Sequence, residues 1–499
     1  MAKQPNVLYI LTDQQKANAI RMYCDIGIPT PNMERLAARG IRYEHAYTPH
    51  PLCVPARISL WTGRFPHQHG SRTNEFLMPA EEKNFAGVLR EAGYRLALFG
   101  KNHCFPDDVT EQLFEDRYIF SHHGPEPEDC ENEQEAEVIR WIRTSPPRTP
   151  GMLAAGARVN PFPAEFCPTA ILARRTVRFI ENYADERPLF AWLSIPDPHS
   201  PLQCPEPYAS MHPPESIVLP PWRDEDLDEK MERARVFRDL LGYDTIDEET
   251  IRKRVSIYYG MIRFIDDALG EILDALDRTG MAENTIIVFT SDHGDYSGEH
   301  RMTDKSSTFV EAMTRVPLIV SWPGHLPEGV VEPGVATLLD TIPTCLALAG
   351  IPIPEASEGR PLPCAGGTQR DAVYSEYAAG GPRLHHDDAM RLGKVRLLDR
   401  SPAPVLLRWR EAEGLPKMIR TGRYKYIWDP ADEVDELYDL EADPWELTNL
   451  RSSPDYAEVH RDLRKRLVAW STEAEAAARP MPLLFNPVTG ENTTTPFFP

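Results

Sequence analysis

Four apolar runs, each followed by polar residues, stand out in the hydrophobic pattern of the chain. They cover residues 6–12, 95–100, 189–195 and 285–290 and are rich in Val, Ile, Leu and Phe. Their apolarity is continuous rather than alternating, which is typical of strands that are buried on both faces, as in a parallel sheet.

Helical patterns separate these runs. Residues 252–279 repeat apolar positions at helical spacing and end before Gly280, a residue that favours the position after a helix. Shorter helices are predicted for 32–39 and 169–183. The alternation of strands and helices predicts a doubly wound α/β fold with a mostly parallel sheet, in which ligands bind beyond the carboxyl ends of the strands.

The residues that follow the four runs are of types that bind metals or transfer protons. In chain order they are Asp13, Gln14, Lys101, His103, His199, Asp292 and His293. Each one alone would more often be a capping or solvated side chain. Because the ends of parallel strands meet at one edge of a sheet, we expect these residues to converge there.

The pattern of predicted elements changes after about residue 370. Short strands are predicted there, together with a helix over 454–478, which indicates a smaller α+β unit with an antiparallel sheet. The high proline content, 48 residues, is concentrated in 121–168 and 196–221 and predicts loops rather than helices in those segments. We therefore predict three parts: an α/β catalytic domain (1–370) with loop-rich inserts at about 105–165 and 200–250, an α+β subdomain (371–479), and an apolar, proline-containing tail (480–499). The tail is expected to dock, either on its own core or on a neighbouring subunit as an oligomerisation arm.

Composition narrows the class of protein. The chain of 499 residues has 54 Lys and Arg against 76 Asp and Glu, a formal charge of −22, which argues against a nucleic-acid partner. No apolar run approaches the ~18 residues of a membrane span, and the N-terminus leads directly into a strand-like run. The eight cysteines are scattered without a CxxC pair. We expect a cytoplasmic protein that binds neither nucleic acid nor membrane.

One cysteine lies in a distinctive segment, Cys53-Val54-Pro55-Ala56-Arg57. Pro55 favours the first turn of a helix, so Cys53 is predicted at a helix N-terminus with Arg57 one turn on. Both features favour negative charge at Cys53. For a lone cysteine, the alternative of an ordinary buried thiol is the more common case.

The wider context changes that interpretation. CVPAR matches the C-x-P-x-R signature of the type I, formylglycine-dependent sulfatases of the alkaline phosphatase superfamily. Other segments that resemble this family follow in the same order, from residue 6 to residue 450: PNVLYILTDQQ, TGR (62–64), GKNH (100–103), SDHGDYSGEH (291–300) with Lys305, LLDTIPTCLALAGIPIP (338–354), RTGRYKYI (420–427) and ELYDLEADPWELTNL (436–450). The chain is identified by these motifs as a member of the family, which implies an alkaline phosphatase-like fold.

The resemblance implies that a separate maturation enzyme converts Cys53 to formylglycine. As its hydrate, this residue has two hydroxyl groups: one attacks sulfur, and the other lets the aldehyde re-form and expel sulfate. An unmodified thiol could not perform the second step.

The resemblance also implies a divalent-metal site. Its ligands would be Asp13, Gln14, Asp292 and His293 together with the oxygen derived from Cys53. Such oxygen and imidazole donors suit Ca²⁺, the cation we expect, with Mn²⁺ as the alternative.

Roles for the remaining site residues follow from the same resemblance. Arg57, Lys101 and Lys305 would surround the sulfate, with Asn74 as a weaker candidate for contact with it. His103 would act as the base at the nucleophile, and His199, with Lys305, would bind substrate and protonate the leaving oxygen. His122 and His123 are predicted to be solvated loop residues, with a place facing the leaving group as the alternative.

Two positions depart from the commoner family pattern. Gln14 stands where many sulfatases have Asp, and His293 where they have Asn, a combination similar to the choline sulfatase and phosphonate monoester hydrolase branch. The leading prediction is an arylsulfatase-like sulfuric ester hydrolase that acts on a small anionic ester and forms a homo-oligomer. The alternatives are a phosphonate monoester hydrolase or phosphodiesterase with the same machinery, an inactive relative that binds anions, and a cysteine hydrolase that uses Cys53.

Overall fold

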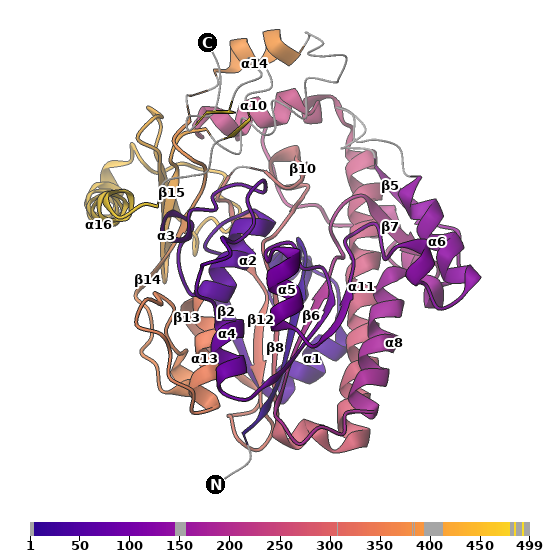
Figure 1. Ribbon diagram of the computed structural model, residues 1–499. Coiled ribbons are helices and arrows are strands. Elements are labelled where there is room, and N and C mark those ends of the chain that lie inside the picture. Colours follow the sequence, from indigo (N-terminus) through magenta and orange to yellow (C-terminus); the bar gives the residue numbers. More distant parts are fainter. Residues whose placement is uncertain are drawn as a thin grey trace.

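A nine-stranded mixed sheet forms the centre of the larger part of the molecule (Figure 1). The computed structural model describes residues 4–144, 156–306, 308–381, 383, 385–393, 413–479, 484–485 and 492–493. The strands of the sheet are β1 (Asn6–Thr12), β2 (Gly40–Tyr47), β3 (Arg95–Gly100), β4 (Asp116–Ile119), β6 (Leu189–Ile195), β8 (Thr285–Ser291), β11 (Arg315–Val316), β12 (Leu318–Ser321) and β13 (Val330–Thr337). Their order is β11-β2-β12-β8-β1-β6-β3-β4, and β13 pairs with β2.

The four predicted strands lie side by side in the middle of this sheet. β8, β1, β6, β3 and β4 run parallel, whereas β12 runs antiparallel to both β8 and β2. Along β1, Leu8 and Ile10 point into one hydrophobic cluster, while Tyr9 and Leu11 point into another on the opposite face. Burial on both faces explains the continuous apolar runs and confirms the α/β fold with a mostly parallel sheet.

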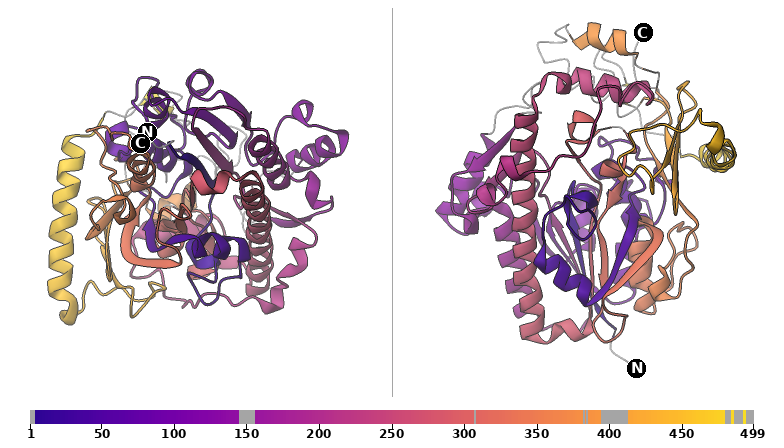
Figure 2. Two further views of the ribbon diagram at one scale, coloured as in Figure 1. Left: turned by 90° about the horizontal axis from the view of Figure 1, so that it is seen from below. Right: turned by 180° about the vertical axis from the view of Figure 1, so that it is seen from behind.

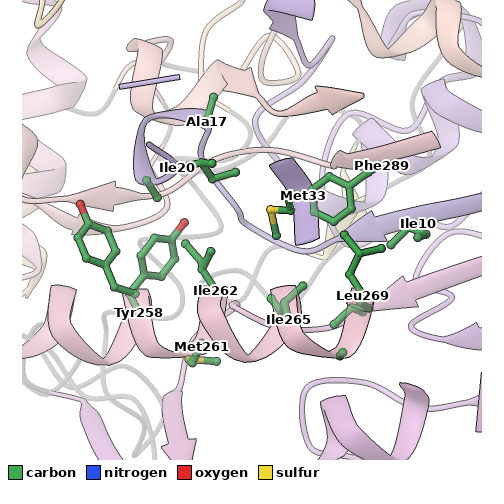
Figure 3. Packing of buried hydrophobic residues seen from close by; sticks show 14 of the residues in the cluster. Ile10, Ala17, Ile20, Met33, Tyr258, Met261, Ile262, Ile265, Leu269 and Phe289 are labelled. Carbon is green, nitrogen blue, oxygen red and sulfur yellow. The ribbon is translucent and has the colours of Figure 1, made fainter. Parts of the chain in front are cut away.

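Three helices cover the first face of the sheet. They are α1 (Pro31–Ala38), α8 (Pro168–Glu181) and the long α11 (Glu248–Thr279). Figure 3 shows Ile262, Ile265 and Leu269 of α11 directed toward Ile10 and Phe289 of the sheet. α11 ends at Gly280, whose left-handed φ of 71° is the conformation that favours glycine after a helix.

The opposite face is covered by α2 (Cys53–Thr62), α4 (Phe85–Glu91) and α13 (Thr341–Leu348). Trp61 of α2 is fully buried and packs edge-on against Trp192 of β6, with ring centroids 5.1 Å apart. α3 (Pro66–His69) follows α2, and α5 (Asp107–Leu113) follows β3. This packing anchors α2 from Trp61, near its C-terminal end, and leaves Cys53 at the edge where the strands end.

A four-stranded antiparallel sheet stands beside the large one. It contains β14 (Ala372–Glu376), β15 (Lys417–Thr421), β16 (Tyr424–Trp428) and β17 (Glu436–Asp439). One face, with Ile419 and Tyr426, packs on α16 (Ala457–Ala476), and the other joins a cluster that includes Tyr47 of β2. α16 and α11 consequently lie on opposite sides of the molecule (Figure 2).

One helix, α6 (Glu133–Arg143), occupies a segment that the prolines had predicted to be a loop. A second helix, α10 (Glu232–Leu240), lies in the predicted insert at about 200–250 but outside the proline-rich segment 196–221. Between residues 131 and 144 there is no proline, and Val138, Ile139 and Ile142 form a buried stripe at helical spacing. The prediction of a loop was wrong there because local amphipathicity outweighed the composition of the surrounding segment.

Short elements complete the described chain. They are β5 (Ala157–Asn160), β7 (Leu202–Pro205), α9 (Tyr208–Met211), β9 (Tyr296–Ser297), β10 (Thr303–Asp304), α12 (Glu311–Thr314), α14 (His386–Gly393), β18 (Leu484–Phe485) and β19 (Asn492–Thr493). Apart from β18 and β19, the predicted tail, 480–499, lies outside the described residues. None of the helices described is long and apolar enough to cross a membrane.

Candidate active site

The carboxyl ends of four neighbouring strands bring the polar residues of the sequence motifs together. Asp13 and Gln14 follow β1, and Asp292 and His293 follow β8, the strand beside it. Lys101 and His103 follow β3, and His199 lies four residues beyond β6. The convergence expected from the strand pattern is therefore present in the structure, because the parallel strands all end at the same edge.

Cys53 lies at the centre of this group, as the first residue of α2. Its Sγ is 3.1 Å from Nε2 of His293, 3.7 Å from Oδ1 of Asp13 and 3.5 Å from Nζ of Lys305. The neighbouring backbone N–H of Val54 donates to Oδ1 of Asn74 over 3.1 Å. Asn74 thus accepts a hydrogen bond from one of the N–H groups that have no partner within the helix at its N-terminus, beside Cys53.

Positive charge surrounds the sulfur atom. Although burial opposes ionisation, Lys305, Lys101 and His293 hold the pKa of the Cys53 thiol well below its usual range. His103 also lies beside Cys53 and contributes a hydrogen bond. The position is consequently suited to a nucleophile that carries negative charge.

Arg57 lies deep within the site. Its side chain is fully buried, with Nε 2.8 Å from Oδ2 of Asp292 and an Nη atom 3.0 Å from Oδ2 of Asp13. The other Nη donates to the carbonyl of Lys101 and to Oγ of Ser194, over 3.0 and 2.7 Å. Arg57 therefore holds two carboxylates of the site in place.

The two carboxylates of this group differ in their affinity for protons. Burial and Cys53 act to raise the pKa of Asp13, but Lys101, His199 and Arg57 hold it below its usual range. Burial and the negative charge of Asp13 raise the pKa of Asp292. Burial would lower the pKa of His293, but Asp292 and Cys53 raise it to about 9. The cluster therefore favours positive charge at this point, which a bound cation would also supply.

The same residues fit a divalent cation. One donor atom from each of Asp13, Cys53, Asp292 and His293 lies within 4.8 Å of the others, and all four side chains are buried. Oε1 of Gln14 is buried and has no hydrogen-bond partner among the described residues. A buried amide oxygen without a partner is costly unless it serves a ligand, and metal coordination would satisfy it.

A second group of residues lies on the other side of Cys53. Nζ of Lys305 is 3.0 Å from Nε2 of His199. Burial, together with the charge of Lys305, lowers the pKa of His199 to about 4. The ring of His122 stacks on that of His199, with centroids 4.6 Å apart and planes 12° apart. His122 is partly buried and lies beside His199, so the structure favours the alternative in which it faces the leaving-group side over a solvated loop position.

Some residues at the site were missed by the sequence analysis. Ser194 binds Arg57, Oη of Tyr258 donates to the Gln14 carbonyl over 2.9 Å, and Asp304 binds the Gln14 side chain. Ser194 and Tyr258 belong to a strand and a helix that were predicted to form the hydrophobic core, and nothing in their local sequence pattern indicates a role at the site. Asp304 directly precedes Lys305, and its place in that motif was a usable signal.

Comparison with known proteins agrees with this geometry. The sulfatase family model matches residues 5–351, so the chain belongs to the sulfatase family. Enzymes of this class hydrolyse sulfuric esters, and this protein is a sulfatase.

Individual relatives cover nearly the whole chain. An arylsulfatase of Clostridium perfringens is 28% identical, over 93% of this chain and 94% of its own length. A choline-sulfatase of Rhizobium meliloti is 31% identical, over 95% of this chain and 88% of its own. The crystal structure of a phosphonate monoester hydrolase of Agrobacterium radiobacter superposes with a TM-score of 0.72 at 25% identity, and the match covers 94% of this chain and 96% of that one.

Proposed function

We propose that the protein hydrolyses sulfate monoesters of small molecules with Cys53, after its conversion to formylglycine by a separate maturation enzyme, as the nucleophilic residue. The observation that carries the proposal is the position of Cys53 between a buried cluster of metal-ligand type and the His199–Lys305 pair. When formed, the formylglycine hydrate supplies one hydroxyl that attacks sulfur and a second that allows release of sulfate without hydrolysis of the ester by water.

The proposed metal ligands are Asp13, Gln14, Asp292 and His293, with the oxygen that replaces Sγ of Cys53. We propose that these residues would hold Ca²⁺, with Mn²⁺ as the alternative; a divalent cation there would lower the pKa of the nucleophile and offset charge on the sulfuryl group. Arg57 holds the Asp13 and Asp292 carboxylates in the orientation that this requires.

Proton transfer is assigned to the histidines and Lys305. His103, beside Cys53, takes the proton from the residue's second hydroxyl. On the opposite side, His199 and Lys305 act as a hydrogen-bonded pair that donates a proton to the leaving oxygen; because the pKa of His199 is lowered to about 4, the proton originates from the Lys305 ammonium. Lys101 and Lys305 provide positive charge for the sulfate oxygens. Asn74, which accepts the hydrogen bond of the Val54 N–H at the N-terminus of α2, fixes the place of Cys53.

Modification of Cys53 has a direct test. The tryptic peptide that follows Arg42 and ends at Arg57 contains Cys53. From a host with a maturation enzyme, mass spectrometry should find this peptide with the lower mass of the aldehyde. Detection of the unmodified thiol alone in an active preparation would contradict the proposal and favour a cysteine hydrolase.

A second candidate function is the hydrolysis of phosphonate monoesters. It is favoured by the similarity to the phosphonate monoester hydrolase structure and by the presence of Gln14 and His293 in the metal-ligand set. The test compares kcat/KM for an aryl sulfate and an aryl phosphonate monoester on one metal-replete preparation. We expect the sulfate to be preferred; preference for the phosphonate by an order of magnitude or more would reverse the assignment.

A further inference from the structure

A single buried carboxylate, that of Asp304, contacts residues from both sides of the nucleophile. Asp304 ends the short strand β10, which pairs with β9. Its side chain is buried, and its backbone has a positive φ of 70°, a conformation that Asp tolerates better than most residues. Lys305 follows directly in the chain.

On the metal side, Asp304 is one of two buried carboxylates that orient the Gln14 amide. Nε2 of Gln14 donates to Oδ1 of Asp304 over 2.9 Å. A carboxylate accepts hydrogen bonds, so Asp304, together with Asp295, whose buried carboxylate also bonds the Gln14 side chain, binds the NH₂ group and directs Oε1 the other way. Oε1 is indeed the atom that has no hydrogen-bond partner among the described residues.

On the leaving-group side, the same carboxylate binds the segments that carry His199 and Lys305. Oγ of Ser200, the residue after His199, donates to Oδ1 and Oδ2 of Asp304 at 3.2 and 3.0 Å. The backbone N–H of Lys305 donates to Oδ1 over 2.9 Å.

The carboxylate is itself held by the scaffold. An Nη atom of Arg254, on α11, lies 3.6 Å from Oδ2 of Asp304. Arg254 is buried, so a charge pair at this place is screened little by solvent. The long helix that packs on the sheet thereby fixes the position of Asp304.

We propose that Asp304 is a positioning residue that fixes both the metal-facing orientation of Gln14 and the placement of the His199–Lys305 pair. It does not touch substrate. The inference rests on the proposed function, but its effect on metal binding can be measured without turnover. Loss of an outer contact of this kind typically costs roughly 10- to 100-fold in metal affinity or activity.

The test uses three single variants of the full chain. Asp304→Ala removes both sets of contacts, Gln14→Ala removes only the contact on the metal side, and Ser200→Ala removes only one on the leaving-group side. Asp340→Asn is the control, since Asp340 is a buried carboxylate that accepts the Arg360 N–H and pairs with Arg370 away from these residues.

Two quantities are measured for each variant. The first is the Kd for Ca²⁺ and for Mn²⁺, added as chlorides to metal-free protein and followed by calorimetry. The second is the dependence of kcat/KM on the leaving-group pKa across a series of aryl sulfates. A role in folding alone would change neither of them at a temperature where the protein is folded.

We expect Asp304→Ala to weaken metal binding by about tenfold or more and to steepen the leaving-group dependence. Gln14→Ala should change mainly the Kd, and Ser200→Ala mainly the leaving-group dependence. In the Gln14→Ala background, Asp304→Ala should weaken metal binding no further, because its effect passes through Gln14.

An unchanged Kd and an unchanged leaving-group dependence in Asp304→Ala would overturn the inference, as would effects in the double variant that are simply additive. If Asp304→Ala does not fold, Ser200→Ala tests the effect on the leaving-group dependence. Asp304→Asn, which keeps one acceptor oxygen, then tests the effect on metal affinity. It should bind metal within about threefold of the wild type, and a larger loss would overturn the inference for the metal side. Failure of the proposed function would instead appear as full activity in a Cys53→Ala variant.

Discussion

The two sides of Cys53 are built in different ways. On the metal side, Asp13, Gln14, Asp292 and His293 directly follow two paired parallel strands and are almost completely buried. On the leaving-group side, His122 and His199 come from loops, and Lys305 follows a two-residue strand. The first side inherits its geometry from the sheet, whereas the second depends on contacts between segments that could vary without altering the core.

This difference indicates where in the site the specificity for substrate can change. The strand ends cannot move without disturbing a sheet that is packed on both faces, so the chemistry at the metal side is fixed by the fold. The loops can change in length and sequence at lower cost. We therefore expect substitutions on the metal side to abolish catalysis, and substitutions on the leaving-group side to produce effects that depend on the leaving group.

Substitution of the nucleophile should have the largest effect. Cys53→Ala removes the residue that both sides serve, and kcat for an aryl sulfate should fall by about 10⁴ or more. The fold should be retained, since α2 is held mainly by Trp61 and its neighbours. Turnover assays and circular dichroism measure the two expectations, and substantial activity in the variant would rule out the mechanism.

Loss of the metal should come next. Asp292→Asn keeps the shape of the side chain but removes its charge, so metal affinity should fall by more than the roughly 10- to 100-fold that an outer contact is worth. A chelator should inactivate the wild-type protein, and added metal should restore it. Metal content after dialysis gives the measurement, with Asp340→Asn as a control; normal content in Asp292→Asn would remove this residue from the site.

The leaving-group acid should give a smaller and conditional effect. His199→Ala should lower kcat/KM by roughly 10²–10⁴ for an alkyl sulfate, whose leaving oxygen needs a proton. For 4-nitrophenyl sulfate, whose leaving group is a stable phenolate that needs no proton, the decrease in kcat/KM should be much smaller. An equal loss with both esters would indicate that His199 binds sulfate instead of protonating the leaving group.

The smallest effect is expected at the stacked histidine. An aromatic contact of this kind is worth about 0.5–1.5 kcal/mol, so His122→Ala should reduce kcat/KM by roughly 2- to 12-fold. His123→Ala provides the matched control, because His123 is exposed and its ring contacts His122 at a tilt of 58°. If both variants lose activity equally, the stacking of His122 on His199 has no specific role.

The prediction of the sheet and of the polar residues at its edge succeeded for a local reason. The residues that form β1 and β8 need continuous apolarity because both faces of the sheet are covered, and that requirement is visible in the sequence. Asp13 and Asp292 follow these strands at once, so chain connectivity alone carries them to the edge. Helix α2 was equally predictable, because Pro55 favours the first turn of a helix.

Other features had no local signal. The antiparallel strand β12, between β2 and β8, was not predicted, because its pairing depends on residues almost 280 positions away in β2. The bonds of Arg57 to Asp13 and Asp292 were not predicted from its motif. The direction in which a long side chain points depends on its neighbours in space, not on its motif.

The sequence by itself determined the strand ends, the helix that begins at Cys53 and the residue types of the site, because these follow from burial and from neighbouring positions along the chain. Only the tertiary structure decided which of those residues touch. The stacking of His122 on His199 and the contacts of Asp304 with Gln14 and Ser200 join segments that lie 77, 290 and 104 residues apart. Such contacts arise when the core brings distant loops to one edge, and no local pattern encodes that distance.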